Sequence, residues 1–217
     1  VQALEKTVAA QVTGVLIDTV IADFSDKGEL VTWLQAMKAD VVEHFSLFVR
    51  LSEDVPAAET GGAMSRYSVN LLVDRSRDSG RPVFVEQNPS YENLFGKIEY
   101  RQTQGGGIET DVSLIRAGSL HLSNGGVLIL RAADIAEQPM LWSFIKAALR
   151  DSEIRIEEFY RAGSPPLAGA PKPVPVPLNL KVILIGPPRV YYGFFAQDAE
   201  FSADFKIRAL IDPTVAA

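Results

Sequence analysis

The chain has 217 residues, of which 47% are hydrophobic and 22% are charged, so it can form one sizeable core, or a core with an extended appendage. Its formal net charge of -6 argues against a nucleic-acid-binding surface, because a phosphate backbone is bound by clustered lysine and arginine side chains, and no basic run occurs. Cysteine is absent, which excludes disulfides, cysteine-based zinc sites and thiol redox chemistry and agrees with a cytoplasmic location.

Residues 1–51 are predicted to form a helical hairpin, because apolar residues recur there at three- and four-residue spacing, which places them on one stripe of a helix. The apolar positions of the first helix are Val1, Leu4, Val8, Val12, Val15, Leu16, Val20 and Ile21. Those of the second helix, which follows a break at residues 25–28, are Leu30, Trp33, Leu34, Met37, Val41, Val42, Phe45 and Phe48. A helix of about 22 residues is roughly 33 Å long, so the hairpin either projects from the main core or packs on it.

Residues 52–65 are rich in Glu, Asp, Pro, Ala and Gly, and we interpret them as a solvated connector at a domain boundary. In residues 66–217, short β-rich runs alternate with helical segments, which is typical of an α/β sheet. The predicted strands are residues 67–73, 82–86, 127–130, 154–156 and 180–185.

Two of these strands, at residues 127–130 and 182–185, lack polar alternation, which predicts central strands that are buried on both faces. A helix is predicted at residues 134–149, and Pro139 allows it to begin only there. The proline-rich segment 163–177 is expected to be a long exposed loop with polyproline character. The alternative for this segment is a ligand for a proline-reading domain.

No membrane span is expected, because the longest uncharged apolar stretches, at residues 126–130 and 182–186, are far shorter than the ~20 residues that a membrane helix needs. The chain opens at Val1 directly in a helical pattern, without a basic region followed by an apolar signal core. We therefore expect it to be a piece of a longer protein, which we call the parent protein.

The segment Gln104, Gly105, Gly106 and Gly107 is the strongest glycine-rich candidate for phosphate binding. It lacks the GxxxxGK[ST] pattern in which backbone amides cradle the phosphates, and that pattern occurs nowhere in the chain. We interpret the segment as a mobile surface loop, whose glycines allow many backbone conformations, with a phosphate cradle as the weaker alternative.

His44 and His121 are the only histidines, and neither is paired with nearby acids at metal-ligand spacing, so no metal site is predicted. His44 lies beside the apolar stripe of the second helix, which favours a structural role. His121 lies just before a predicted buried strand, where it could either contact a ligand or cap a turn. Ser119, His121 and one of many acids could be written as a catalytic triad, but any chain of this size allows that combination.

The predicted strand at residues 127–130 ends where a P-loop ATPase carries an acidic residue that holds Mg²⁺ through its waters. Arg131 occupies that place, and a guanidinium cannot ligate a cation. The next acid, Asp134, is expected at the start of a helix, where capping is the commoner role of Asp.

A long segment of unusual composition, NPSYENLFGKIEY at residues 88–100, resembles a signature of the Lon-like proteases of the bacterial and archaeal B/C type. The resemblance continues in the same order through TDVSLIRAGSLH, NGGVLIL and ALRDSEIRIE, at residues 110–121, 124–130 and 148–157. MKADVVEHF at residues 37–45 resembles the helical insertion of these proteins, and KVILIG at residues 181–186 resembles their sensor strand.

The resemblance implies an α/β fold of the AAA+-like, P-loop NTPase type, with helices flanking the sheet and with residues 1–51 as a long α-helical hairpin insertion. It implies a homo-oligomer, hexameric in the parent protein, that feeds unfolded protein substrates to a Ser-Lys serine peptidase domain. The nucleotide-gripping loop and the peptidase domain are not among these residues, so no catalytic residue is expected here. No cofactor is expected in this chain, which alone could not hold ATP in the usual way. ATP and Mg²⁺ remain open for the parent protein, and Arg131 argues against them there too.

By the same analogy, Arg131, Asp134 and Gly186 belong to the remnant of a nucleotide site, and Arg208 is the nearest candidate for an arginine finger. The surface that faces the axial channel of a ring would carry Tyr91, Tyr100, Gln104, Gly105, Gly106, Gly107 and Ile108. For the apolar neighbours Leu94, Phe95 and Ile98, the alternative is that they fill the core.

Three functions remain open at this point. The first is a degenerate AAA+ module that binds and channels unfolded protein with its nucleotide dependence weak or lost. The second is a functioning ATPase engine whose nucleotide loop lies upstream of Val1. The third is a structural or adaptor domain, which would assemble stably without gripping unfolded chains.

Overall fold

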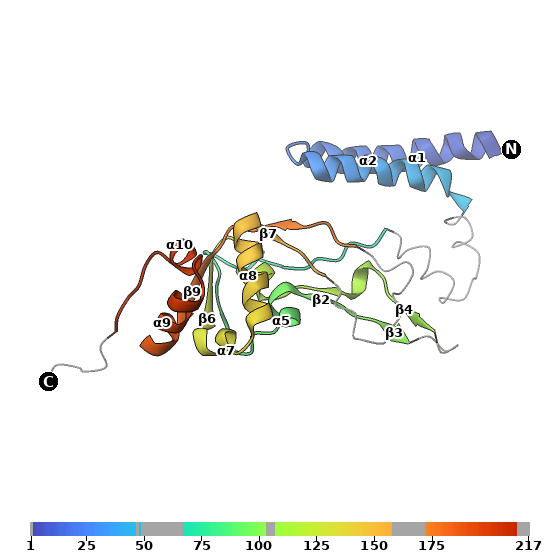
Figure 1. Ribbon diagram of the computed structural model, residues 1–217. Helices are drawn as coiled ribbons and strands as arrows, with labels where there is room; N and C mark the ends of the chain where they lie inside the picture. Colours follow the sequence, from blue (N-terminus) through green and yellow to red (C-terminus); the bar gives the residue numbers. More distant parts are fainter. Residues whose placement is uncertain (1, 47, 49–66, 103–106, 158–171, 212–217) are drawn as a thin grey trace. The chain divides into compact units, whose positions relative to one another are not determined.

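The computed structural model describes residues 2–46, 48, 67–102, 107–157 and 172–211 (Figure 1). The chain divides into two compact units, Val1–Val69 and Asn70–Ala217, which we call unit 1 and unit 2. The connector predicted at residues 52–65 lies outside the described residues.

Unit 1 contains two helices, α1 (Gln2–Asp23) and α2 (Gly28–Glu43), joined by a short turn. They pack against each other through Ile17, Leu34 and Val41, which are the buried apolar side chains among the described residues of this unit. A salt bridge of 2.7 Å between Lys38 Nζ and Asp18 Oδ2 adds a polar link between the helices. The two predicted helices are therefore present, and their role as an insertion of a larger domain stays a prediction.

Most of the large apolar side chains in the predicted stripe of α1 are exposed. Helix α2 therefore covers this stripe only in part. A groove of about 610 Å³ runs between the two helices. Its walls are almost entirely apolar and include Leu4, Val8, Val12, Met37, Val41, Phe45, Phe48 and Tyr67. Tyr67 is fixed there by a 2.7 Å hydrogen bond from its hydroxyl to Asp40 Oδ2.

Unit 2 is built on a three-stranded parallel sheet with the strand order β1 (Val83–Glu86), β6 (Val127–Arg131) and β9 (Lys181–Ile185). Val83 aligns with Val127 across the first pair of strands, and Val127 aligns with Lys181 across the second. Because all three strands run in the same direction, their carboxyl ends meet at one edge of the sheet.

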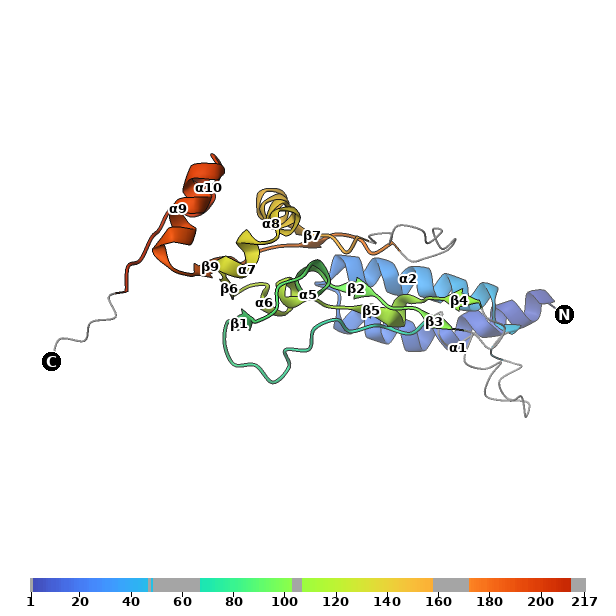
Figure 2. The same ribbon diagram turned by 60° about the horizontal axis from the view of Figure 1, so that its bottom comes forward.

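Helices and short antiparallel strand pairs complete the described part of unit 2. The helices are α5 (Tyr91–Phe95), α6 (Ser119–Ser123), α7 (Ala132–Ala136), α8 (Pro139–Asp151), α9 (Pro188–Gln197), α10 (Phe201–Asp204) and the 3₁₀ helix η1 (Val112–Leu114). Antiparallel pairs join β2 (Lys97–Ile98) to β5 (Ile115–Arg116), β3 (Arg101–Gln102) to β4 (Ile108–Glu109), and β7 (Glu153–Ile154) to β8 (Val176–Pro177). Figures 1 and 2 both place the β3–β4 hairpin at the end of unit 2 opposite to α9.

The sheet is packed on one face only, so the prediction of strands buried on both faces is wrong for the described residues. Leu128 and Leu130 of β6 point into a core with Leu94, Ile135 and Ile145. On the opposite face, the side chains of β1 and β9 are 46 to 66% exposed. These are Val83, Val85, Ile183 and Ile185. The helices described here cover a single face, although a parallel sheet normally carries helices on both.

Aromatic side chains fill the core where α8, α9 and α10 meet. Trp142 of α8 lies 4.9 Å from Phe194 and 6.1 Å from Phe201, measured between ring centroids. Its indole Nε1 donates a 2.6 Å hydrogen bond to Asp198 Oδ2, so the one polar atom of the ring is satisfied. Asp198 also forms a 2.9 Å salt bridge with Lys146, which ties α8 to the end of α9.

Several local predictions need correction. Residues 67–73 form no strand; Val69 and Leu71 are exposed there, and no other strand pairs with them among the described residues. The predicted helix at 134–149 is divided into α7 and α8, and α8 begins at Pro139 as expected. The strand at 154–156 is shorter than predicted, because the β7–β8 ladder ends at Ile154. Most of the proline-rich segment lies outside the described residues, although its Val176 and Pro177 form β8.

Candidate functional site

The carboxyl edge of the parallel sheet is the first candidate site, because ligands of open α/β sheets bind outside the carboxyl ends of the strands. Glu86 ends β1, Arg131 ends β6, and Gly186 follows β9. The predicted remnant residues Arg131 and Gly186 therefore lie at the ends of neighbouring strands. Asp134 joins them from the first helix after β6.

Arg131 is held by two partners from different segments. Its Nε donates a 2.9 Å hydrogen bond to Asp134 Oδ2, and its Nη2 donates a 2.5 Å hydrogen bond to the carbonyl oxygen of Gln87. Gln87 directly follows β1, so the guanidinium connects the ends of two adjacent strands and α7. The fixed fork of donors on arginine suits this role, because it can satisfy a carboxylate and a carbonyl at the same time.

The described residues of this edge do not fit a magnesium nucleotide. A positive guanidinium stands where an acidic residue would hold the ion, and the carboxylate of Asp134 is already paired with it. Residues 186–188 after β9 are Gly-Pro-Pro, which offers no polar side chain. Within the described ranges, no group of three or more His, Asp or Glu side chains could hold a metal ion.

Gly186 allows a close approach of the chain at this edge. A Cβ atom at Gly186 would lie 3.1 Å from the Cβ atom of Ala132, the residue that begins α7. The end of β9 therefore packs directly on the start of α7, with no room for a larger side chain at Gly186.

Arg208, the arginine-finger candidate, is engaged with aromatic rings of α9. Its Nη1 donates a 3.0 Å hydrogen bond to the hydroxyl of Tyr192, and its guanidinium carbon lies 5.1 Å from the ring centroid of Tyr191. The hydrogen bond to Tyr192 raises the pKa of Arg208, which stays positively charged. Its action on a neighbouring subunit stays a prediction.

Tyr91, a predicted channel residue, is part of the packing around α5. Its ring stacks on Phe95 at 4.6 Å and meets Phe144 edge-on at 5.1 Å. The hydroxyl donates to the carbonyl of Arg155 at 3.0 Å and accepts from the backbone N–H of Glu157 at 3.2 Å. Burial raises the pKa of Tyr91 to about 12, so the phenol is neutral at physiological pH. Tyr91 thus joins α5 to the segment that follows β7.

The other predicted channel residues belong to the β3–β4 hairpin. Tyr100 directly precedes β3 and Ile108 begins β4, and both side chains are exposed. Gly107 directly precedes β4, whereas Gln104, Gly105 and Gly106 lie outside the described residues. The hairpin therefore presents one aromatic and one aliphatic side chain to solvent on a two-residue ladder.

The interpretation of the neighbouring apolar residues as core is confirmed for two of them. Leu94 is completely buried and Phe95 almost so, and both belong to the core cluster with Leu128. Ile98 is half-buried on β2. Of the described apolar side chains in this region, Tyr100 and Ile108 are therefore exposed, whereas those of α5 pack in the core, and a role in a channel stays a prediction.

A family model described as a LonB-like AAA domain matches residues 79–212, more than half of the chain. The chain belongs to the LonB-like AAA domain family. The match confirms the resemblance to Lon-like proteins and supports an AAA+-like fold, since β1, β6 and β9 all lie within the matched residues. It does not include α1 and α2. A comparison with curated proteins gave no match.

No helix in the described part of the chain is both long enough and apolar enough to cross a bilayer.

His121 forms a second candidate site in the LonB-like AAA domain, away from the carboxyl edge. It belongs to α6, and its Nδ1 accepts a 3.3 Å hydrogen bond from the backbone N–H of Gly118, the N-cap residue. The residue is 5% exposed, and its Nε2 has no hydrogen-bond partner among the described residues. Burial lowers the pKa of His121 to about 4, so the ring is neutral at physiological pH. The hydrogen bond from Gly118 is what the turn-capping role requires, and contact with a ligand stays a prediction.

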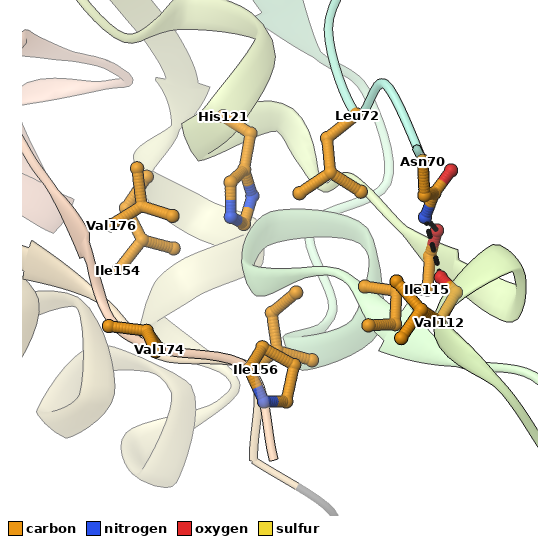
Figure 3. A pocket seen from close by; sticks show the side chains of 10 residues that line it. Asn70, Leu72, Val112, Ile115, His121, Ile154, Ile156, Val174 and Val176 are labelled. Carbon is orange, nitrogen blue, oxygen red and sulfur yellow. Dashed lines mark hydrogen bonds between the residues drawn. The ribbon is translucent and has the colours of Figure 1, made fainter. Parts of the chain in front are cut away.

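The imidazole of His121 lines a cavity of about 100 Å³ (Figure 3). Figure 3 shows the ring reaching from α6 into the space between Leu72, Val176 and Ile154. The other walls include η1, β5 and the segment after β7, and Asn70 is the only other polar residue among the described lining residues. Sequence reasoning missed this cavity, because its described walls come from five segments, between residues 70 and 176, that share no motif.

Proposed function

We propose that this chain is the AAA+-like module of a Lon-like serine protease homologue, and that it binds unfolded polypeptide and passes it to a fused Ser-Lys peptidase domain without nucleotide control. The observation that carries the proposal is Arg131 at the end of the central strand, bonded to Asp134 and to the carbonyl of Gln87. ATP and Mg²⁺ are not cofactors of the module in this account.

The chemistry of Arg131 supports nucleotide independence. Mg²⁺ binds to sites lined by carboxylates and waters. A switch that depends on Mg²⁺ therefore needs negatively charged side chains that the ion neutralises when it binds. A guanidinium at that place carries a permanent positive charge, and it repels the ion. The ends of β1 and β6 are then connected by a group that no hydrolysis step can remove.

Exposed apolar surface supports the binding of unfolded polypeptide. Contiguous apolar patches on a protein surface mark interaction sites, and an unfolded chain offers apolar side chains in any order. The β3–β4 hairpin exposes Tyr100 and Ile108, and the groove of about 610 Å³ between α1 and α2 is almost entirely apolar. Both surfaces can grip a chain without reading its sequence, as a processive protease requires.

We further propose that the parent protein is a cytoplasmic homo-oligomer, assembled as a hexamer, with the β3–β4 hairpin on the side of the axial channel. The negative net charge favours protein rather than nucleic acid as the partner, since phosphate binding needs clustered cations.

An ATPase engine is the second candidate function, and the sheet itself favours it. β9 pairs only with β6 among the described strands, so its other edge can accept a further parallel strand. A strand carrying a nucleotide-binding loop could supply the phosphate contacts there. In that case the loss of an acid at Arg131 must be compensated by another residue of the parent protein.

The proposal is tested by fluorescence anisotropy of labelled casein, an unfolded polypeptide, added to this chain with and without Mg·ATP. We expect binding that is unchanged by nucleotide. Tyr100→Ala should weaken it roughly fivefold, the effect of losing about 1 kcal/mol from an exposed aromatic anchor. Met140→Ala removes a similarly exposed apolar side chain at the start of α8 and should leave the affinity unchanged. Absence of casein binding would contradict the proposal.

A further inference from the structure

The cavity beside His121 contains a hydrogen-bond donor that the described residues do not satisfy. Because Nδ1 accepts the N–H of Gly118, the proton of the neutral ring resides on Nε2. Nε2 is shielded from solvent and has no acceptor among the described residues. Buried polar groups are almost always paired, so an unpaired one in a native structure calls for a ligand or a water.

The shape and chemistry of the cavity define what it can hold. Its volume of about 100 Å³ is close to that of one branched aliphatic side chain, and smaller than the ~150 Å³ engineered cavity that binds benzene. The walls formed by Leu72, Ile115, Ile154 and Val176 are apolar. An occupant must therefore combine an aliphatic group of that size with one acceptor oxygen for the Nε2–H group.

The surroundings of the cavity favour a polypeptide as the source of that group. Ile156 and Val174 line the cavity beyond the end of the β7–β8 ladder, which stops at Ile154 and Val176. Val174 is 82% exposed, so the apolar lining continues to the surface of the molecule. A chain lying across this lining can place one side chain in the cavity and a main-chain carbonyl beside it.

We propose that this cavity binds one aliphatic side chain of an extended polypeptide, and that a main-chain carbonyl of the same segment accepts the hydrogen bond from His121 Nε2. The inference rests on the proposed function and adds to it a binding subsite with a preference for Leu, Ile or Val. Because Nε2 is shielded, the carbonyl reaches it when the inserted side chain displaces the apolar neighbours of the ring.

A small probe tests the subsite separately from the whole substrate. N-acetyl-leucine amide is titrated into the full chain, and the imidazole resonances of His121 are followed by NMR, assigned with the His44→Asn variant. We expect a saturable shift with a Kd on the order of millimolar, as befits a ligand of few atoms. N-acetyl-glycine amide, which lacks the aliphatic group, should produce no such shift.

Two variants connect the cavity to substrate binding. His121→Asn keeps an acceptor for the N–H of Gly118 and removes the Nε2–H donor. Val174→Phe covers the opening with a larger side chain at an exposed position. We expect each to weaken casein binding about three- to tenfold, the range of a lost single anchor contact. Ile207→Phe makes the same kind of change at a 92% exposed residue that does not line the cavity, and should have no effect.

The outcomes separate this inference from the proposed function. Casein binding that is unchanged in both variants, with no leucine amide shift, would overturn the subsite and leave the proposed function intact, since the cavity would then hold only water. A leucine amide shift without any casein binding would overturn both the proposed function and the polypeptide as occupant. A shift together with weakened casein binding in both variants is the result that supports the inference.

Discussion

Arg131 ends strand β6 and His121 lies on α6, the helix that precedes this strand, and the polar atoms of the two side chains differ in how they are bonded. The guanidinium of Arg131 is largely exposed, yet it is bonded to Asp134 and to the carbonyl of Gln87. The imidazole of His121 is 5% exposed, yet its Nε2 has no partner among the described residues. The comparison teaches that the edge resembling a nucleotide site is internally satisfied, whereas the unsatisfied polar atom lies in a cavity that no motif marks.

The largest effect is expected from Gly118→Ala, which disturbs the turn that holds His121. A Cβ atom at Gly118 would lie 2.3 Å from the carbonyl oxygen of Leu94 and 2.4 Å from the backbone N of Gly96. Both are backbone atoms, so α5 and α6 must move apart, and we expect a loss of about 3 kcal/mol or more in the free energy of unfolding. Urea unfolding measures it.

Gly80→Ala is the matched control for this substitution. No heavy atom lies within 4 Å of a Cβ built at Gly80, so the unfolding free energy should change by less than about 0.5 kcal/mol. Equal stability of the two variants would show that α6 is not fixed by the close approach at Gly118, and the position of His121 would lose its explanation.

The next effect is a pH dependence of the free energy of unfolding that arises from His121. The pKa of His121 is lowered from 6.5 to about 4 by burial, so the unfolded chain binds a proton below pH 6.5 that the folded chain binds only near pH 4. The free energy of unfolding is therefore not reduced by His121 above pH 6.5. It falls as the pH is lowered from 6.5 toward 4, by about 3 kcal/mol in total.

Comparison with His121→Asn isolates this contribution, because the carboxyl groups of the chain titrate in both proteins. Between pH 7 and pH 4, the unfolding free energy of the unmodified chain should fall by about 3 kcal/mol more than that of the variant. Parallel pH profiles would mean that the imidazole takes up a proton as easily in the folded chain as in the unfolded chain, and the burial of the His121 ring would be wrong.

A smaller effect is expected at the carboxyl edge. Arg131→Gln removes the ion pair with Asp134 and the charged hydrogen bond to Gln87, and thermal unfolding should show a loss of about 1 kcal/mol. Arg150→Gln removes an exposed pair with the adjacent Asp151 and should cost less than about 0.5 kcal/mol. If Arg131→Gln instead stabilised the chain, the guanidinium would be a strained remnant rather than a connection between strands.

Sequence reasoning predicted the elements whose signal is local. The apolar runs of β6 and β9 have no turn residues, and Pro139 can begin a helix but cannot continue one, so these features follow from short stretches of chain. Residues 67–73 are also rich in Val, Leu and Tyr but form no strand. The difference is tertiary, because a strand exists only where a partner accepts its backbone hydrogen bonds.

The candidate sites show the same division. The place of Arg131 at the end of a strand could be predicted, since the strand and its direction are local features. Its bond to Gln87 could not, because the neighbouring strand is far away in sequence. The cavity of His121 forms because Leu72, Ile115 and Val176 lie around the same imidazole ring. The spacing of apolar residues along the sequence does not predict such contacts between distant segments. The bare face of the sheet was missed for a related reason, as an apolar strand does not reveal what covers it.

The central claim is that Arg131 has replaced nucleotide control, and titration calorimetry of Mg·ATP against the parent protein tests it most directly. The unmodified parent protein is compared with its Arg131→Asp variant, and this chain alone serves as the control. The account predicts no binding heat from either form of the parent protein. Binding of Mg·ATP by the unmodified parent protein with micromolar affinity, about -8 kcal/mol, would contradict it and would favour an ATP-driven engine.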